Sequence, residues 1–195
     1  MFEMKMKFDE SDNIGVRLGR SVADRFTNLF GGVFQQTPLS AVLTEIEKID
    51  PTFDQNEFLD FCRIVIIPNI LEAIIRRDIE ILKDWCNESL ANLFAQQIDQ
   101  MKQAGRVLDM KILDLSHLEL EAGRMMEQGP VLIISFDTQE TEVLRDLKGK
   151  IVEGDPEKIF RTKYYWALCR NQEELDPRTA WRLIELSCQR TEQML

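Results

Sequence analysis

The sequence predicts an α+β domain in which N-terminal amphipathic helices are followed by a layer of helices packed on a bent antiparallel sheet. Up to Gly105, apolar residues recur at spacings of three and four, as in helices. After Gly105, short segments rich in β-branched and aromatic residues alternate with turn residues. A chain of 195 residues with 44% hydrophobic residues is long enough for one globular core. A strongly bent sheet over helices forms a half-open cone, so we expect an apolar cavity inside it.

The first expected helix spans residues 12–34 and carries a single apolar stripe. Three arginines flank the stripe, and Gly31 and Gly32 loosen the end of the helix. Gly15 and Gly19 each weaken the first turns by about 1 kcal/mol relative to Ala, so we expect this helix to need a surface to fold against.

Four further helical segments follow. Thr37 is a suitable N-cap with Pro38 as the first helical residue of a helix that ends at Asp50-Pro51. The next begins at Asp54, with Glu57 completing a capping box, and runs to residue 75 with a kink or interruption at Pro68. Because this segment is apolar on nearly all sides, we expect it to be central and buried. Amphipathic segments at residues 78–82 and 87–103 complete the helices.

Four segments have the composition of strands, and turn residues separate them. Lys148-Gly149 suits a hairpin turn, and Gly154-Asp155-Pro156 suits a second reversal. The expected strands are residues 107–120, 130–144, 159–170 and 181–188.

The acidic charge of the chain is unevenly distributed. The formal net charge is −10, yet residues 1–36 are neutral overall, with five bases and five acids. The excess of acid argues against a nucleic-acid partner. The charge boundary divides the chain into an N-terminal lead with an amphipathic helix, residues 1–36, and a C-terminal domain, residues 37–195, with the helix at 37–50 assignable to either.

The helix at 12–34 has two interpretations. An amphipathic stripe normally packs on the core of its own domain. A cationic helix with a phenylalanine-rich face also fits a membrane interface, where arginine heads reach lipid phosphates. In the second interpretation, the membrane-binding residues are Arg17, Leu18, Arg20, Val22, Arg25, Phe26, Leu29, Phe30, Val33 and Phe34.

Signatures of catalysis, metal binding and membrane spanning are missing from the sequence. None of the motifs of phosphate-binding loops, dinucleotide folds, nucleophile elbows or zincins occurs, and no cofactor is expected. We interpret His117, Glu119 and Glu121 as one exposed polar face of a strand, and Asp155 as a turn residue. The four cysteines are separated widely, as expected of reduced, buried thiols. The most apolar stretch, residues 61–75, is too short to span a bilayer.

Two further groups of residues have both a structural and a binding interpretation. Trp85, Tyr164, Tyr165, Trp166 and Trp181 could stack a flat ligand, but core packing is the more common role of such residues. The acidic run at residues 173–176 is most simply a solvated loop, with docking of a basic partner as the alternative.

Five segments of the sequence resemble the C-terminal domain of the Tim44 family of mitochondrial inner-membrane import proteins. The similarity covers residues 11–195. The segments are SDNIGVRLGRSVADRFTNLFGGVF (11–34), IPNILEAIIRRDIEILKDWC (67–86), EQGPVLIISF (127–136), VEGDPEKI (152–159) and YWALCRNQEELDPRTAWRLIELS (165–187).

The resemblance implies a cone related to nuclear transport factor two, with membrane-associating helices at 12–34 and 38–49. It implies a peripheral, matrix-side, non-enzymatic adaptor that binds cardiolipin and links the presequence translocase to the matrix heat-shock chaperone, with co-chaperones and translocating precursors as further partners. In the family, a charged N-terminal half outside these 195 residues supplies much of the chaperone contact. The implied cavity is expected to be lined by Phe58, Phe61, Val65, Leu71, Ile74, Ile134, Phe136, Tyr165 and Trp166.

The alternative function is that of a cone-fold enzyme, such as an isomerase, or a small-molecule or lipid binder that uses the cavity. Enzymes of this kind place a buried carboxylate in the pocket with a partner that shifts its pKa. An acid buried at the cavity floor and paired with Tyr164 or Tyr165 would favour this alternative.

Overall fold

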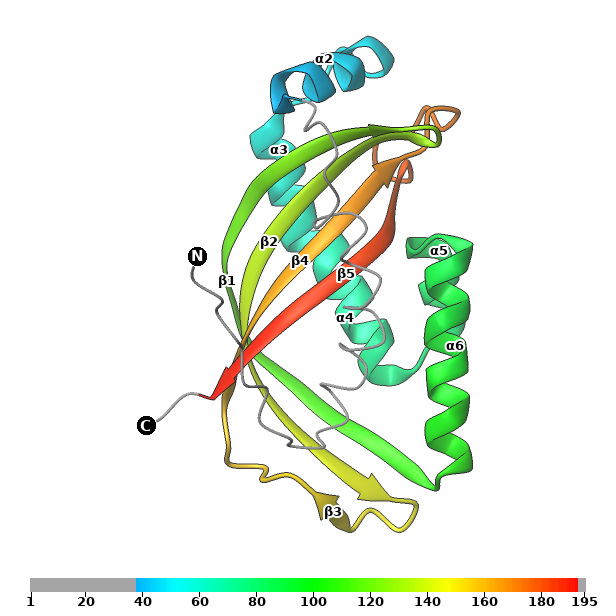
Figure 1. Cartoon of the computed structure of the whole chain (residues 1–195), viewed down its shortest axis with the longest axis vertical. Helices are drawn as coiled ribbons and strands as arrows, with labels where there is room; N and C mark the ends of the chain where they lie inside the picture. The colour runs from blue at the N-terminus through cyan, green and yellow to red at the C-terminus, as the bar shows by residue number, and fades with distance from the viewer. Residues whose placement is uncertain (1–37, 193–195) are drawn as a thin grey trace, which may run out of the picture.

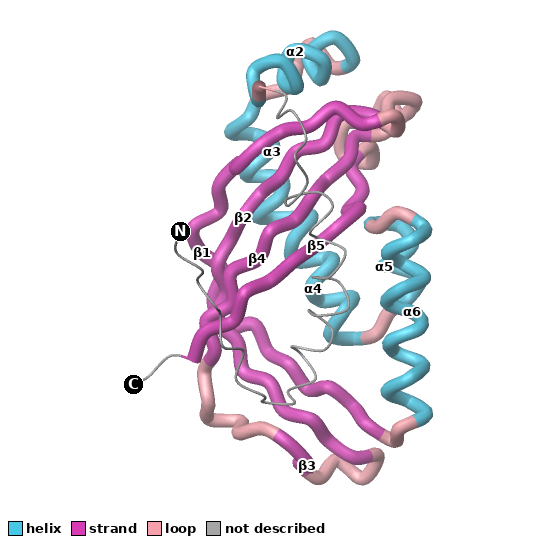
Figure 2. Tube along the Cα trace, in the orientation of Figure 1, coloured by secondary structure: helices cyan, strands magenta, loops and turns pink. Residues whose placement is uncertain are grey.

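Five antiparallel strands form one sheet in the computed structural model, which describes residues 38–192 (Figure 1). The strand order is β1-β2-β4-β5, and β3 pairs with the end of β2. Two long strands, β1 and β2, make a bent hairpin that extends beyond β4 and β5 (Figure 2). The strands are β1 (Arg106–Met126), β2 (Gly129–Asp146), β3 (Ile151–Glu153), β4 (Phe160–Arg170) and β5 (Trp181–Glu192). The predicted α+β class with a bent antiparallel sheet is confirmed.

The bend is concentrated in β1. Relative to β2, β1 carries one extra residue between Ile112 and Asp114, another between Ser116 and Glu119, and a third between Leu120 and Ala122. Extra residues of this kind bend a strand and increase its twist. The pairing of β2 with β4 has no such irregularity, so the edge strand curves around a regular centre.

The helices lie on the concave side of the sheet, except for α2 at one end (Figure 1). The Asp54 carboxylate accepts the backbone N–H groups of Asn56 and Glu57, as its predicted capping role requires. Pro38 is the N-cap residue of α2 and not its first helical residue, and Thr37 lies outside the described residues. The helices are α2 (Leu39–Ile49), α3 (Gln55–Phe61), the π-helical turn η1 (Cys62–Ile66), α4 (Ile67–Arg76), α5 (Ile79–Trp85) and α6 (Glu88–Gln103).

Pro68 interrupts the hydrogen bonding of the central helix without ending it. Proline has no N–H to donate, and the preceding turn is widened so that the Ile67 N–H reaches the carbonyl of Cys62. The Asn69 side chain donates to the Val65 carbonyl at 2.7 Å. The widened turn keeps one face of the run from α3 to α4 directed at the sheet, where Ile66 and Ile70 are buried.

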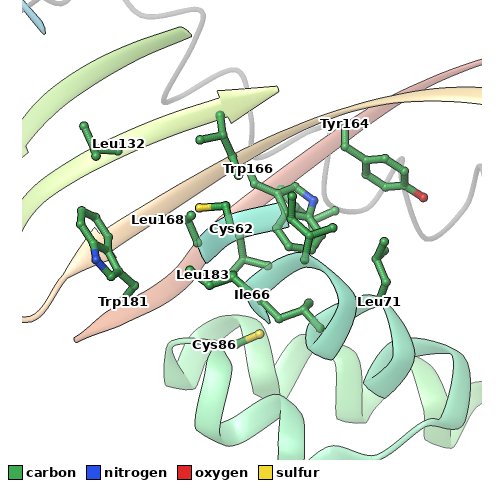
Figure 3. Close-up of a cluster of buried hydrophobic side chains, with 14 of the residues drawn as sticks. Cys62, Ile66, Leu71, Cys86, Leu132, Tyr164, Trp166, Leu168, Trp181 and Leu183 are labelled. Atoms are coloured by element: carbon green, nitrogen blue, oxygen red, sulfur yellow. The ribbon is translucent and has the colours of Figure 1, made fainter. Parts of the chain in front are cut away.

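The core fills the space between this helical run and the sheet (Figure 3). Phe136 stacks on Tyr164 at a centroid distance of 5.1 Å and meets the edge of Trp166 at 5.0 Å. Trp166 is completely buried. Alternate strand residues face the helices, and Leu132, Ile134 and Leu168 continue this apolar face.

Helix α2 packs on the body of the domain. Val42 and Ile46 on its apolar face are fully buried. Gly123 of β1 permits this approach, because a Cβ atom there would lie 3.0 Å from side-chain atoms of Leu39 and Val42. The centre of the apolar face of this helix therefore packs on the body of the domain, with Leu39 and Leu43 partly buried beside it.

A buried ion pair fastens the end of α2 to the end of β4. An oxygen of Asp50 lies 3.6 Å from Nη2 of Arg170, and the Arg170 side chain is 1% exposed. Arg170 also donates through Nη1 to the carbonyl oxygens of Asn171 and Glu174. The pair thus links α2 to the loop between β4 and β5.

We predict that Asp50→Ala lowers the free energy of unfolding by about 3 kcal/mol, because it leaves the Arg170 guanidinium buried without its counter-charge. The double variant Asp50→Leu/Arg170→Met removes both charges and should cost less than the single change. Urea unfolding of the three proteins measures the difference. A double variant less stable than the single variant would contradict this account of the pair.

Candidate functional site

The predicted membrane-binding residues, from Arg17 to Phe34, lie outside the described residues. Within residues 38–192, no helix is long and apolar enough to cross a membrane. The functional candidates of the described part are therefore the predicted cavity, a neighbouring apolar hollow and a buried polar cluster on the sheet.

Most of the predicted cavity residues belong to the packed core. Five are buried there, and Phe61 and Ile74 pack at its border. Val65 is half-buried outside this cluster. The five buried residues are Phe58, Leu71, Ile134, Phe136 and Trp166.

The prediction for Tyr165 needs correction. It precedes Trp166 on β4, and successive residues of a strand point to opposite faces of the sheet. Trp166 faces the helices, so Tyr165 lies on the outer face, where the Lys163 ammonium sits 5.4 Å from its ring centroid. The sequence grouped both residues because their composition is aromatic, although the alternation within a strand separates them.

An apolar hollow lies beside the core, between α4, α5, α6 and the first residues of β1. Its cavity volume is about 30 Å³, and the hollow is partly open to solvent. Ile74 is the one predicted cavity residue that lines it. The lining residues are Ile74, Ile75, Arg77, Leu82, Phe94, Gln97, Ile98, Met101, Leu108 and Met110.

Two polar side chains border the hollow. Arg77 donates from Nη1 to the Leu108 carbonyl at 3.0 Å, which joins the end of α4 to β1. The Gln97 side-chain oxygen is buried without a hydrogen-bond partner among the described residues. An unpaired carbonyl at an apolar wall is suited to a ligand that donates one hydrogen bond. The sequence carried no signal for this position, since Gln97 occurs within an ordinary amphipathic helix.

A buried polar cluster interrupts the apolar inner face of the sheet where β2 passes β4 and β5. Glu140 is completely buried. Its Oε1 accepts from Thr162 at 2.7 Å and from Arg190, and its Oε2 accepts from Thr138 at 3.0 Å and from Tyr164 at 3.2 Å. Arg190 also donates to Glu142 at 2.9 Å.

Glu140 is a buried acid paired with Tyr164, which is the feature that would favour the enzyme alternative. Each oxygen of Glu140 already accepts two hydrogen bonds, which uses its acceptor capacity. Burial and the charge of Glu140 raise the pKa of Tyr164 well above its ordinary value, so the phenol keeps its proton and acts as a donor. Burial lowers the pKa of Arg190, but its bonds and charge interactions with Glu142 and Glu140 outweigh burial and raise it overall. The arrangement is that of a structural network in which both oxygens of Glu140 are occupied, while Nη1 of Arg190 is buried without a hydrogen-bond partner among the described residues.

The other polar candidates have the structural roles that were expected. His117, Glu119 and Glu121 are exposed on β1, where His117 lies 3.3 Å from Asp137 and Glu121 accepts from Ser135. Asp155 is exposed and accepts the Glu157 backbone N–H in a turn. Among the described residues, no group of three or more histidine, cysteine or acidic side chains could hold a metal ion.

The cysteines and most of the aromatic residues are structural as well. All four cysteines are unpaired, and Cys62, Cys86 and Cys169 are buried. Burial raises the pKa of Cys86 to about 12, which keeps the thiol protonated. Tyr164, Trp166 and Trp181 are core residues, as predicted.

Comparison with known proteins places this chain next to import proteins. Residues 39–187 match the family described as the Tim44-like domain. The Rattus norvegicus protein named mitochondrial import inner membrane translocase subunit TIM44 is 52% identical over 194 residues, which are 100% of this chain and 43% of the rat protein. The Saccharomyces cerevisiae protein of the same name is 31% identical over 183 residues, 91% of this chain and 42% of the yeast protein. The chain therefore spans less than half the length of these relatives.

A solved structure supports the fold alone. The crystal structure of the intermembrane space region of chloroplast protein ARC6 has a TM-score of 0.51 with this chain at 15% sequence identity. The likeness covers 72% of this chain and 100% of that chain.

We predict that Glu140→Leu lowers the free energy of unfolding by about 3 kcal/mol or more, which is the usual effect of breaking a buried ion pair. The reason is that Arg190 and three hydroxyl groups lose their hydrogen-bond acceptor. Glu157→Leu, a change of the same type at an exposed turn, should have an effect within about 0.5 kcal/mol. Thermal and urea denaturation measure both. Equal stability of Glu140→Leu and the unchanged protein would show that the cluster is not the structural network described above.

Proposed function

Because the chain belongs to the Tim44-like domain family, we propose that it is a non-enzymatic, peripheral adaptor of the mitochondrial protein import machinery at the inner membrane. The support is its 52% identity over its full length to a protein named as a subunit of the inner-membrane import translocase. The geometry of the Glu140 cluster agrees with an adaptor, since it leaves no free carboxylate for chemistry.

We propose further that residues 12–34 bind cardiolipin-containing membrane on the matrix side. The observation that carries this proposal is the amphipathic stripe flanked by Arg17, Arg20 and Arg25. Each arginine near an anionic leaflet contributes about 1 kcal/mol.

The proposed partners are translocase subunits, the matrix heat-shock chaperone with its co-chaperones, and translocating precursors. The acidic loop at residues 173–176 is a candidate contact for the basic members of this set. Glu173 and Asp176 are exposed in this loop. The Arg170 side chain fixes the loop by donating a hydrogen bond to the Glu174 carbonyl oxygen. We assign the chaperone contact mostly to the N-terminal half of the longer relatives.

We predict that deletion of residues 12–34 lowers the affinity for phosphatidylcholine vesicles containing cardiolipin at least tenfold, since the deletion removes three interfacial bases. Arg17→Gln/Arg20→Gln/Arg25→Gln should show most of this loss on cardiolipin vesicles and little change on neutral ones. Vesicle flotation measures the binding. Equal flotation with both vesicle types, or unchanged flotation after the deletion, would refute the proposed role of this segment.

A second candidate function is the binding of an apolar small molecule in the hollow between α4, α6 and β1. The specific observation is the unpaired oxygen of Gln97 at an otherwise apolar wall. A ligand with an apolar body and one donor group would satisfy it.

We predict that Ile98→Trp, which fills the hollow, weakens binding of a fluorescent apolar probe at least about tenfold. Ile64→Trp is the matched control, because Ile64 is 71% exposed on η1 and does not line the hollow. Fluorescence titration of the three proteins measures the binding. Equal probe affinity in all three would exclude the hollow as the site.

A further inference from the structure

One end of the domain combines exposed apolar side chains with uncompensated positive charge. At the hairpin between β2 and β3, Leu147 is 74% exposed and Val152 is 42% exposed. The end of α6 lies beside this hairpin. Arg106, the first residue of β1, is the strand-register partner of Asp146 in β2, and the Gly105 backbone lies against the Leu147 side chain. We call this surface the basic tip and define it by Lys102, Arg106, Leu147, Lys148, Lys150 and Val152.

The turn that carries Leu147 is held in one conformation. The Asp146 carboxylate accepts the backbone N–H groups of Lys148 and Lys150, each at 2.9 Å. Arg145 donates to the Gly149 carbonyl at 3.0 Å and is itself anchored by Asp109 at 2.7 Å. Gly149 has a φ of 83°, which favours glycine. The exposure of Leu147 therefore results from a well-bonded turn, and presenting the side chain costs no further ordering.

The charges of the basic tip lack partners. Lys102, Arg106, Lys148 and Lys150 form no ion pair with the described residues, while the nearby Asp109 is paired with Arg145 and Asp146 is engaged by the backbone of the turn. With Asp146 and Glu153 counted, this end holds four bases and two acids, whereas residues 37–195 together carry 19 bases and 29 acids. An anionic surface is the complementary partner.

The size of the tip indicates which anionic surface it fits. A specific protein interface buries about 800 Å² per partner and uses 20–30 residues a side, far more than two protruding apolar side chains offer. A lipid interface needs no matching shape, because acyl chains accept an inserted leucine while headgroup phosphates surround the lysines. Lys150 directly precedes β3 and Val152 lies within it, and both side chains are exposed at this end of the domain.

We propose that the basic tip is a membrane contact that inserts Leu147 into an anionic lipid interface, with Lys148 and Lys150 at the level of the phosphates. This inference rests on the proposed function, because it adds a second contact to that of residues 12–34. The tip and α2 lie at opposite ends of the long axis (Figure 1).

An environment-sensitive fluorophore on the whole chain tests the insertion directly. It is attached in the Leu147→Cys variant in a Cys188→Ser background, because Cys62, Cys86 and Cys169 are buried and unreactive. The matched control is the same label in the Leu175→Cys variant, since Leu175 is 84% exposed in the acidic loop. On phosphatidylcholine vesicles containing cardiolipin, the label at position 147 should shift to the blue, and the label at position 175 should not.

Affinity measurements on the whole chain complete the test. Lys148→Gln/Lys150→Gln should weaken binding to cardiolipin vesicles by about fivefold per lysine, with no change on phosphatidylcholine alone. Leu147→Ser should weaken it by about tenfold. Leu175→Ser and Lys83→Gln are the controls on other surfaces and should leave the affinity unchanged.

The outcomes separate the tip from the segment at 12–34. If the whole chain binds cardiolipin vesicles but the label at position 147 stays in water and Leu147→Ser floats normally, the tip proposal is wrong and the role of residues 12–34 stands. A label that stays in water while the lysine variant loses binding to cardiolipin vesicles shows a headgroup contact without insertion and overturns the proposed insertion of Leu147. If the whole chain binds no better to cardiolipin vesicles than to neutral ones, both proposals fail.

Discussion

The covering of the concave sheet face by a single helical run is the constraint on which the rest of the structure depends. The sheet presents Phe136, Trp166 and their apolar neighbours, and the run from α3 to α4 must keep one apolar face directed at them for its whole length. Pro68 would break an ordinary helix at this point. The π-helical turn before it absorbs the lost hydrogen bond and maintains the packing of Ile66 and Ile70. The bulges of β1 then curve the sheet around this run.

The helix-facing side of the sheet changes from apolar to polar along β2, and this change organises the rest of the domain. Phe136 closes the apolar part, and the next residues on the same face, Thr138, Glu140 and Glu142, form the polar cluster with Arg190. The hairpin continues beyond it to the basic tip, while α2 closes the opposite end through Asp50 and Arg170. The domain therefore has two chemically different ends, separated by the core and the buried polar cluster of Glu140, Glu142 and Arg190.

The sequence predicted those features that depend on local patterns. The cap at Asp54, the four longer strands and the buried cysteines follow from residue type and periodicity, whereas the short strand β3 was not predicted. The face of Tyr165 was predicted wrongly because composition does not fix strand register. The hollow at Gln97 and the Glu140 cluster could not be predicted, because each joins segments far apart in the chain. The basic tip was missed for the same reason, since it needs the end of α6 beside the turn after β2.

A net charge of −10 at first argues against an anionic membrane as a partner. The structure makes the two compatible, because positive charge and exposed apolar side chains gather at one end of the acidic body. Hydrogen–deuterium exchange of the whole chain, with and without cardiolipin-containing vesicles, tests this account most directly. It predicts slower exchange at residues 12–34 and 146–152 in the presence of vesicles, with no change at residues 171–178. Slower exchange confined to residues 171–178, or none at either predicted segment, would contradict it.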